Sequence, residues 1–292
     1  MVSESDRPVV VGVDGSSASL AAVDFAVDEA TLRKSSLLIA YGHLRHPSLT
    51  LWRSRTEPYV TRGIRRLLEA VAGRAQARDS SLDVDIDLLL KEPGAALAER
   101  SRDACLMVVG HSGRAGAALG SVAARVASHA GCPVIVHRPF TGARRGPGAV
   151  TVGVDGSELS AGAVAFALEE AAFRGADLNA VLVWAHSPGA DPAGPHPVRY
   201  DYSEARAEAE RMLAEQLTGV AAVYPDVRVA REVVHSLDTT RTLLDRSGHA
   251  QLIVVGSRGR DGVAGLLLGS VSHALINRAA CPVAVVRHHA HG

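Results

Sequence analysis

Short apolar runs rich in β-branched residues alternate along the chain with longer segments in which apolar positions recur at helical spacing. In the second half, the apolar runs predict strands at 150–154, 178–186, 227–234, 252–256 and 282–287. The segments between them predict helices at 157–175, 203–220, 237–248 and 269–280. Several strand runs lack strict alternation, as parallel strands buried on both faces do. The pattern therefore predicts an α/β fold with a doubly wound parallel sheet.

The pattern occurs twice in the chain. Residues 9–30 return as 149–171, and residues 107–139 return as 253–289. A repeat of this length indicates duplicated domains, because arrays of small structural units repeat every 20 to 50 residues or so. We therefore expect two tandem domains of the same fold.

The segment between the copies, 139–149, is rich in Pro, Gly and Arg and is typical of a linker. It divides the 292 residues into two domains of ordinary size. We place the first domain at 1–142 and the second at 147–292.

Charge and composition exclude several classes of protein. Lys and Arg total 31, as do Asp and Glu, so there is no overall charge attraction to nucleic acid. No apolar run is long enough to cross a membrane, and residues 1–8 lack the apolar segment of a signal peptide. The three cysteines, Cys105, Cys132 and Cys281, suit neither a disulfide framework nor a zinc site. We expect a cytoplasmic protein without nucleic-acid or membrane partners.

The segment VVGSRGRDGVAGLLLGSV, residues 254–271, carries the clearest functional pattern. Glycines directly after a strand let the backbone approach an anion. The helix that begins near Gly269 and Ser270 directs free N–H groups and the positive end of its dipole at the same place. Ser270 itself suits either a helix cap or a phosphate contact. Only Lys34 and Lys91 are lysines, so a P-loop with its phosphate-binding lysine is excluded.

Asp155 follows the first strand of the second half. In a doubly wound sheet, ligands bind at the carboxyl ends of the strands where the strand order reverses, so this carboxylate should lie near the glycine loop. It suits ribose hydroxyls or a Mg²⁺ ion held by a nucleotide. The alternative is structural, since Asp-Gly-Ser is also an ordinary turn and helix cap. The same elements recur around Asp14 and Gly110, which favours nucleotide binding.

Gly256-x-x-Gly259, nine further residues and Gly269-Ser270, together with VGVDGS at 152–157, resemble the universal stress protein family in its tandem-domain form. The resemblance covers nearly the whole chain. It implies a five-stranded parallel sheet of order 3-2-1-4-5 in each half, and ATP as the ligand of the glycine loop.

The resemblance also implies which residues contact the nucleotide. In the second half these are the turn at Gly153, Val154 and Asp155, an adenine wall at Val183 and Trp184, and a ribose and phosphate loop at Val255, Gly256, Gly259, Gly269, Ser270 and Val271. In the first half they are Gly12, Val13, Asp14, Tyr41, Gly110, Gly113, Gly120, Ser121 and Val122.

The first loop departs from the family pattern. Only the six residues 114–119 separate Gly113 from Gly120, where the second loop has nine. We therefore expect weaker nucleotide binding in the first half. Beyond Mg²⁺ held by the nucleotide near Asp14 or Asp155, no metal site is expected.

These patterns favour an ATP-binding regulatory protein that acts through nucleotide-dependent conformation or partner contacts. Two alternatives stay open: a slow ATPase or adenylate-handling enzyme, and a dimerising scaffold without nucleotide. No nucleophile or paired-carboxylate motif is evident, so catalysis is not expected.

The fifth strands, at 133–139 and 282–288, begin with proline, are rich in valine and lie at a sheet edge in the implied order. Uncovered apolar edges invite strand pairing, so we expect the two halves to pair through these strands. The family resemblance further implies a homodimer of whole chains.

Overall fold

The computed structural model describes residues 7–44, 53–113, 119–141, 148–185, 202–259 and 268–287. The first half contains β1 (Val9–Gly12), α1 (Ser17–Arg33), β2 (Leu37–Gly42), α2 (Arg53–Arg78), β3 (Val84–Leu89), α3 (Pro93–Arg100), β4 (Leu106–Gly110), α4 (Ser121–His129) and β5 (Val134–His137). The second half contains β6 (Val150–Val154), α5 (Glu158–Phe173), β7 (Leu178–Trp184), α6 (Tyr202–Leu217), α7 (Val220–Val223), β8 (Val229–His235), α8 (Thr239–Ser247), β9 (Leu252–Gly256), α9 (Ser270–Arg278) and β10 (Val283–Val286).

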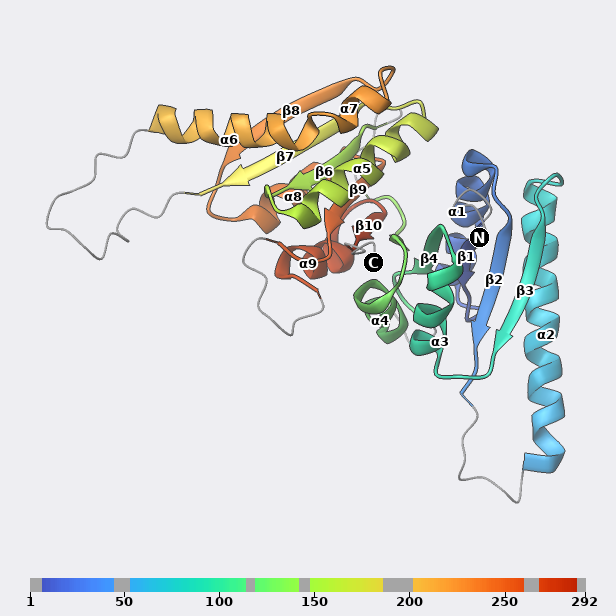
Figure 1. The fold of residues 1–292 in the computed structure, drawn as a ribbon. Coiled ribbons are helices and arrows are strands. Elements are labelled where there is room, and N and C mark those ends of the chain that lie inside the picture. Colours follow the sequence, from blue (N-terminus) through green and yellow to red (C-terminus); the bar gives the residue numbers. More distant parts are fainter. Residues whose placement is uncertain are drawn as a thin grey trace, which may run out of the picture.

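All ten strands form one sheet, in the order β3-β2-β1-β4-β5-β10-β9-β6-β7-β8. Within each half the strands are parallel and follow the order 3-2-1-4-5, which confirms the predicted fold (Figure 1). The halves join where β5 and β10 pair antiparallel, with Val134 opposite Val285 and Val136 opposite Val283. The prediction that the fifth strands pair with each other is therefore confirmed.

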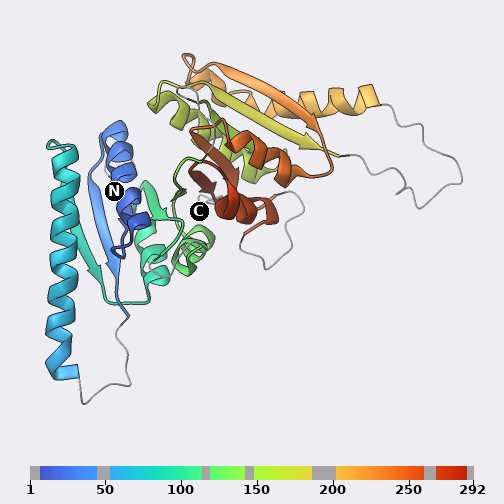
Figure 2. The ribbon, with the colours of Figure 1, turned by 180° about the vertical axis from the view of Figure 1, so that it is seen from behind.

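Helices cover both faces of the sheet (Figures 1 and 2). One core lies beneath α1, α2, α5 and α6, and the other beneath α3, α4, α8 and α9. β1 is buried along its whole length, as are β9 up to Val255 and all of β10. None of the described helices is long and apolar enough to cross a membrane.

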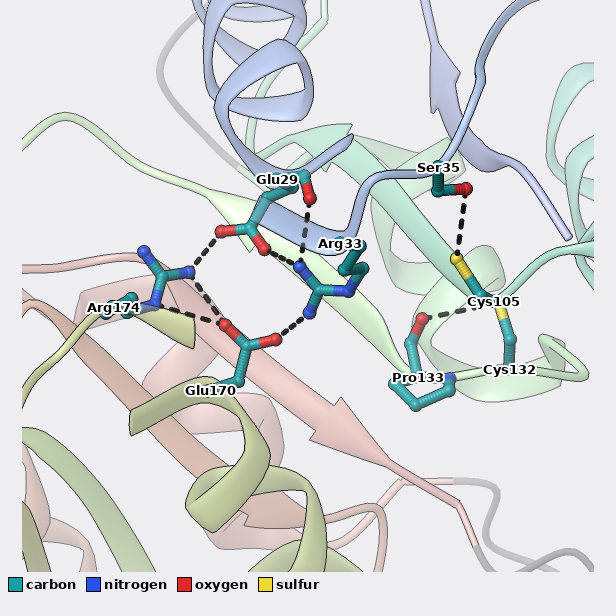
Figure 3. Close-up of polar contacts among 8 residues, drawn as sticks. All are labelled: Glu29, Arg33, Ser35, Cys105, Cys132, Pro133, Glu170 and Arg174. Atoms are coloured by element: carbon teal, nitrogen blue, oxygen red, sulfur yellow. Dashed lines mark hydrogen bonds and ion pairs between the residues drawn. The ribbon is translucent and has the colours of Figure 1, made fainter. Parts of the chain in front are cut away.

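Four charged side chains from the carboxyl ends of α1 and α5 meet between the halves (Figure 3). The carboxylates of Glu29 and Glu170 are fully buried, and Arg33 and Arg174 are nearly so. Each arginine pairs with both glutamates, for example Arg174 with Glu170 at 2.8 Å. A neutral set of four charges can be buried because every group has partners of opposite sign. We call these residues the interdomain tetrad.

One predicted helix was too long. The pattern at 203–220 predicts a single helix, but α6 ends at Leu217 and the separate turn α7 follows. Gly219 adopts φ +85°, a left-handed conformation that glycine enters readily and that ends the helix. The strand predicted at 178–186 ends at Trp184, and residues 186–201 lie outside the described part.

Candidate functional site

The turn after β6 fixes the position of Asp155. Its Oδ1 accepts hydrogen bonds from the backbone N–H of Ser157 at 3.0 Å and from the Ser157 hydroxyl at 2.6 Å. The Ser157 oxygen also accepts from the Ser160 N–H and so caps α5. Gly156 adopts φ +79°, which favours glycine at the centre of the turn. Asp155 Oδ1 and the Ser157 oxygen therefore serve as an ordinary turn and helix cap, which is the structural alternative for Asp-Gly-Ser.

The other carboxylate oxygen of Asp155 faces the glycine loop. A Cβ atom added to Gly259 would lie 2.9 Å from Asp155 Oδ2. The first half repeats this arrangement, because a Cβ atom on Gly113 would lie 3.1 Å from Asp14 Oδ2. Since β6 pairs with β9 and β1 with β4, both carboxylates lie at the reversal of strand order, beside the second glycine of each loop.

The two ends of each glycine loop are tied together at a narrow neck. The Gly269 N–H donates to the Ser257 carbonyl at 2.7 Å, and the Gly120 N–H donates to the His111 carbonyl at 2.8 Å. The Ser272 hydroxyl adds a second hydrogen bond to the Ser257 carbonyl at 3.0 Å. The glycine hydrogen bond is therefore common to both halves, although the first loop is three residues shorter and has Ala123 in place of Ser272. Residues 114–118 and 260–267 lie outside the described part.

Gly269 and Gly120, rather than the serines that follow, are the N-cap residues of α9 and α4. Of the two roles predicted for Ser270, capping is therefore wrong. Ser270 and Ser121 are the first helical residues, and both are exposed at the amino end of the helix. This placement is compatible with the other role, a hydroxyl contact to a phosphate.

Several predicted contact residues have buried side chains. Val154 and Val255 belong to the two cores, as does Val13 in the first half. Gly153 is enclosed by α8, since a Cβ atom there would lie 3.0 Å from Leu243 Cδ1, and the equivalent Gly12 is enclosed by Leu97. At these positions only the backbone can face a ligand.

Val183 and Trp184 do not form one wall. Val183 packs toward the core beneath α8 and α9, whereas Trp184 packs toward the core beneath α6. The indole of Trp184 contacts the rings of His235 and Tyr202, with centroids 4.5 and 5.3 Å away. An aromatic cluster from β7, β8 and α6 therefore stands at the carboxyl edge of the sheet, and only Trp184 of the predicted pair belongs to it.

In the first half, Tyr41 pairs in register with Leu88 and packs against the core. Since Leu37 and Leu178 start equivalent strands, the position that corresponds to Trp184 is His43. The nucleoside end of the first half therefore differs in side chains from that of the second.

Two histidines also distinguish the first loop. His111 directly follows β4, and His137 ends the neighbouring strand β5. Burial lowers the pKa of both imidazoles, that of His137 to about 4. The equivalent positions in the second half are Ser257 and Val286, and sequence reasoning did not single out either histidine.

Among the described residues, no cluster of three His, Cys, Asp or Glu side chains could hold a metal ion. The site thus consists of one carboxylate, a tied glycine loop and a helix amino terminus. It offers groups that suit a nucleotide, and a Cβ atom at Gly259 would crowd the carboxylate of Asp155.

The sequence pattern of the universal stress protein family matches residues 7–138 and again residues 148–287. The chain belongs to the universal stress protein family. Universal stress protein Rv2005c of Mycobacterium tuberculosis is 38% identical over 292 aligned residues, covering 96% of each chain.

Solved universal stress proteins share this fold. The structure of one from Archaeoglobus fulgidus has a TM-score of 0.70 at 18% identity and covers 98% of both chains. A shorter universal stress protein, solved in complex with cAMP, is 32% identical, covers 44% of this chain and 94% of its own, and has a TM-score of 0.35.

Proposed function

We propose that this universal stress protein binds ATP in its second half and acts as a regulatory protein whose shape or partner contacts depend on the nucleotide. The observation that carries the proposal is the position of Asp155 Oδ2 directly opposite Gly259, beside a loop whose ends are tied at Gly269. The first half places Asp14 beside Gly113 in the same way, so the proximity of the carboxylate to the loop glycine occurs in both halves.

The groups of the second half suit the three parts of ATP. Asp155 would accept hydrogen bonds from ribose hydroxyls, and its carboxylate suits a Mg²⁺ ion that the nucleotide would bring. The backbone after Gly256 and the amino end of α9 would hold the phosphates without a lysine, since free N–H groups and the helix dipole both favour anions. Trp184 would flank the adenine.

Binding in the first half would be weaker. Its loop is tied by the equivalent glycine hydrogen bond but is three residues shorter, so it would enclose less of a triphosphate. His43 replaces the indole at the nucleoside end. We propose further that the halves correspond to domains at 1–142 and 147–292, and that the protein is a cytoplasmic homodimer.

Substitution of Gly269 tests the ATP site. Its φ of −73° suits alanine, and the new Cβ atom would lie in ordinary contact with the Arg258 Cα atom and the Gly259 nitrogen, so the fold should survive. The same methyl group would cover the loop backbone that is meant to face the phosphates. Gly269→Ala should therefore weaken ATP binding at least about tenfold by calorimetry, which corresponds to roughly 1.4 kcal/mol.

Gly73→Ala is the matched control, because that glycine lies in α2 with open space around its Cα atom. It should bind ATP as the parent does. A parent protein that binds no ATP, or a folded Gly269→Ala variant with unchanged affinity, would refute the site.

A phosphate-release assay separates this function from its enzymatic alternative. A regulatory binder should retain ATP over many minutes without releasing phosphate. Steady turnover that disappears in Gly269→Ala would instead establish an ATPase at the same site.

A further inference from the structure

The segment after β5, in the first half, contacts the end of α9, in the second half. The Arg138 guanidinium donates from Nε to the Ala279 carbonyl and from Nη1 to the Ile276 carbonyl, both at 3.0 Å. The Thr141 N–H donates to the Ala280 carbonyl at 3.1 Å. Two hydrogen bonds therefore run from one half to the carboxyl end of α9 in the other, and a third reaches Ala280, the residue after its C-cap.

These bonds satisfy groups that a helix leaves open. The last carbonyls of a helix lack partners within it and carry the negative end of its dipole. A guanidinium group holds several donors in one plane and stays charged at neutral pH, so Arg138 satisfies two carbonyls and opposes the dipole at once.

The opposite end of α9 is the proposed phosphate site. Its N-cap, Gly269, is tied to Ser257 at the neck of the glycine loop. The helix is nine residues long, so both ends belong to one short rigid element. A displacement at Ile276 and Ala279 would therefore move the N–H groups at Ser270 relative to the loop.

Among the described residues, the arginine contact is not repeated in the opposite direction. Arg287 occupies the position in the second half that corresponds to Arg138, and its Nη1 is buried without a hydrogen-bond partner among the described residues. In the described part of the chain, no hydrogen bond joins Arg287 to α4, the phosphate-side helix of the first half. The anchored helix belongs to the half with the full-length glycine loop.

We infer that Arg138 is a positioning residue for the phosphate loop of the other half. The inference rests on the proposed ATP site. It gives the first half a role besides weak binding, namely to hold α9 where its amino end meets the phosphates. The consequence is specific: loss of Arg138 should weaken contacts to phosphate and spare contacts to the nucleoside.

The test compares ATP with adenosine in calorimetric titrations of the full chain. Arg138→Met should weaken ATP binding about three- to tenfold, the range that a charge at a helix end supports. Adenosine affinity should change less than about twofold, because adenosine does not reach α9. Arg138→Lys keeps the cation and should recover part of the loss, and Arg287→Met should bind both ligands as the parent does.

An equal loss for ATP and adenosine in Arg138→Met, or an equal loss of ATP affinity in Arg287→Met, would overturn the inference. Hydrogen exchange at the amide of His273, which donates to the Gly269 carbonyl at 3.0 Å, gives a second measurement in the ligand-free variants. This amide should exchange faster than in the parent in Arg138→Met and Arg138→Lys, and at the parental rate in Arg287→Met. Unchanged exchange in both Arg138 variants would also overturn it. If the parent binds no ATP, the proposed function fails, and the exchange data still decide whether Arg138 anchors α9.

Discussion

At the scale of single residues, the same amino acid often serves two purposes in this protein. Asp155 holds the turn after β6 through Oδ1 while Oδ2 faces the glycine loop. A Cβ atom at Gly259 would crowd that carboxylate, whereas one at Gly153 would crowd the side chain of Leu243. The glycines that looked alike in the sequence therefore differ in what a side chain would disturb.

His137 makes stability depend on pH. Burial lowers its pKa to about 4, whereas a histidine in the unfolded chain has a pKa near 6.5. Between these values the unfolded chain binds a proton that the folded protein does not. The free energy of unfolding should therefore fall as the pH drops from about 6.5 to 4, by roughly 2–3 kcal/mol.

His137→Val introduces the residue that the second half has at Val286 and should remove this part of the pH dependence. Urea unfolding at pH 7 and pH 4.5 measures it, with the exposed His273→Ala as the control. If His137→Val and the parent lose the same stability on acidification, His137 is not the source.

At the scale of elements, α1 and α5 join the halves through the interdomain tetrad. Removing one charge leaves its partners buried and uncompensated, which is costly. Glu170→Gln should lower the free energy of unfolding by about 3 kcal/mol in urea. Glu208→Gln removes an exposed partner of Arg211 on α6 and should change it by less than about 1 kcal/mol. Similar effects of the two substitutions would contradict this assignment.

Adding a charge between β5 and β10 should destabilise the protein, just as removing a charge from the interdomain tetrad should. Val285 is fully buried opposite Val134, so Val285→Asp would place an unpaired carboxylate inside the sheet. We expect faster proteolysis at 139–149 and a lower melting temperature. Ala230→Asp, on the exposed part of the outer strand β8, should resemble the parent. Parental stability and proteolysis in Val285→Asp would refute pairing through this strand.

Sequence reasoning reached the strands, because buried valine runs and an internal repeat are strong signals. The strand order came from the family resemblance, and the pairing of the fifth strands was inferred from the edge position that this order gives them. It missed the break at Gly219, since a glycine within a helical pattern does not reveal its φ. It also could not show that the side chains of Val183 and Trp184 pack into different cores, because this depends on which helices cover each side of the strand. Arg138 escaped notice because its partners, backbone carbonyls 138 and 141 residues away, leave no trace in side-chain pattern.

At the scale of the whole molecule, the two halves share a fold and differ in their sites. The outer strands β3 and β8 carry Asp85, Asp87, Arg231 and Glu232, charges that discourage further strand pairing at the ends of the sheet. A homodimer should therefore form through helices or loops. Light scattering gives its mass, and a dimer that persists in Ala230→Asp would agree with this expectation.

The number of ATP molecules bound per chain tests the central claim most directly. Calorimetric titration of the full-length protein, after denaturation and chromatography have shown what nucleotide it already carries, gives this number. The account predicts one tight site per chain, in the second half, and much weaker binding in the first. Two equally tight sites would show that the shortened loop is harmless, and the absence of both binding and carried nucleotide would contradict the account.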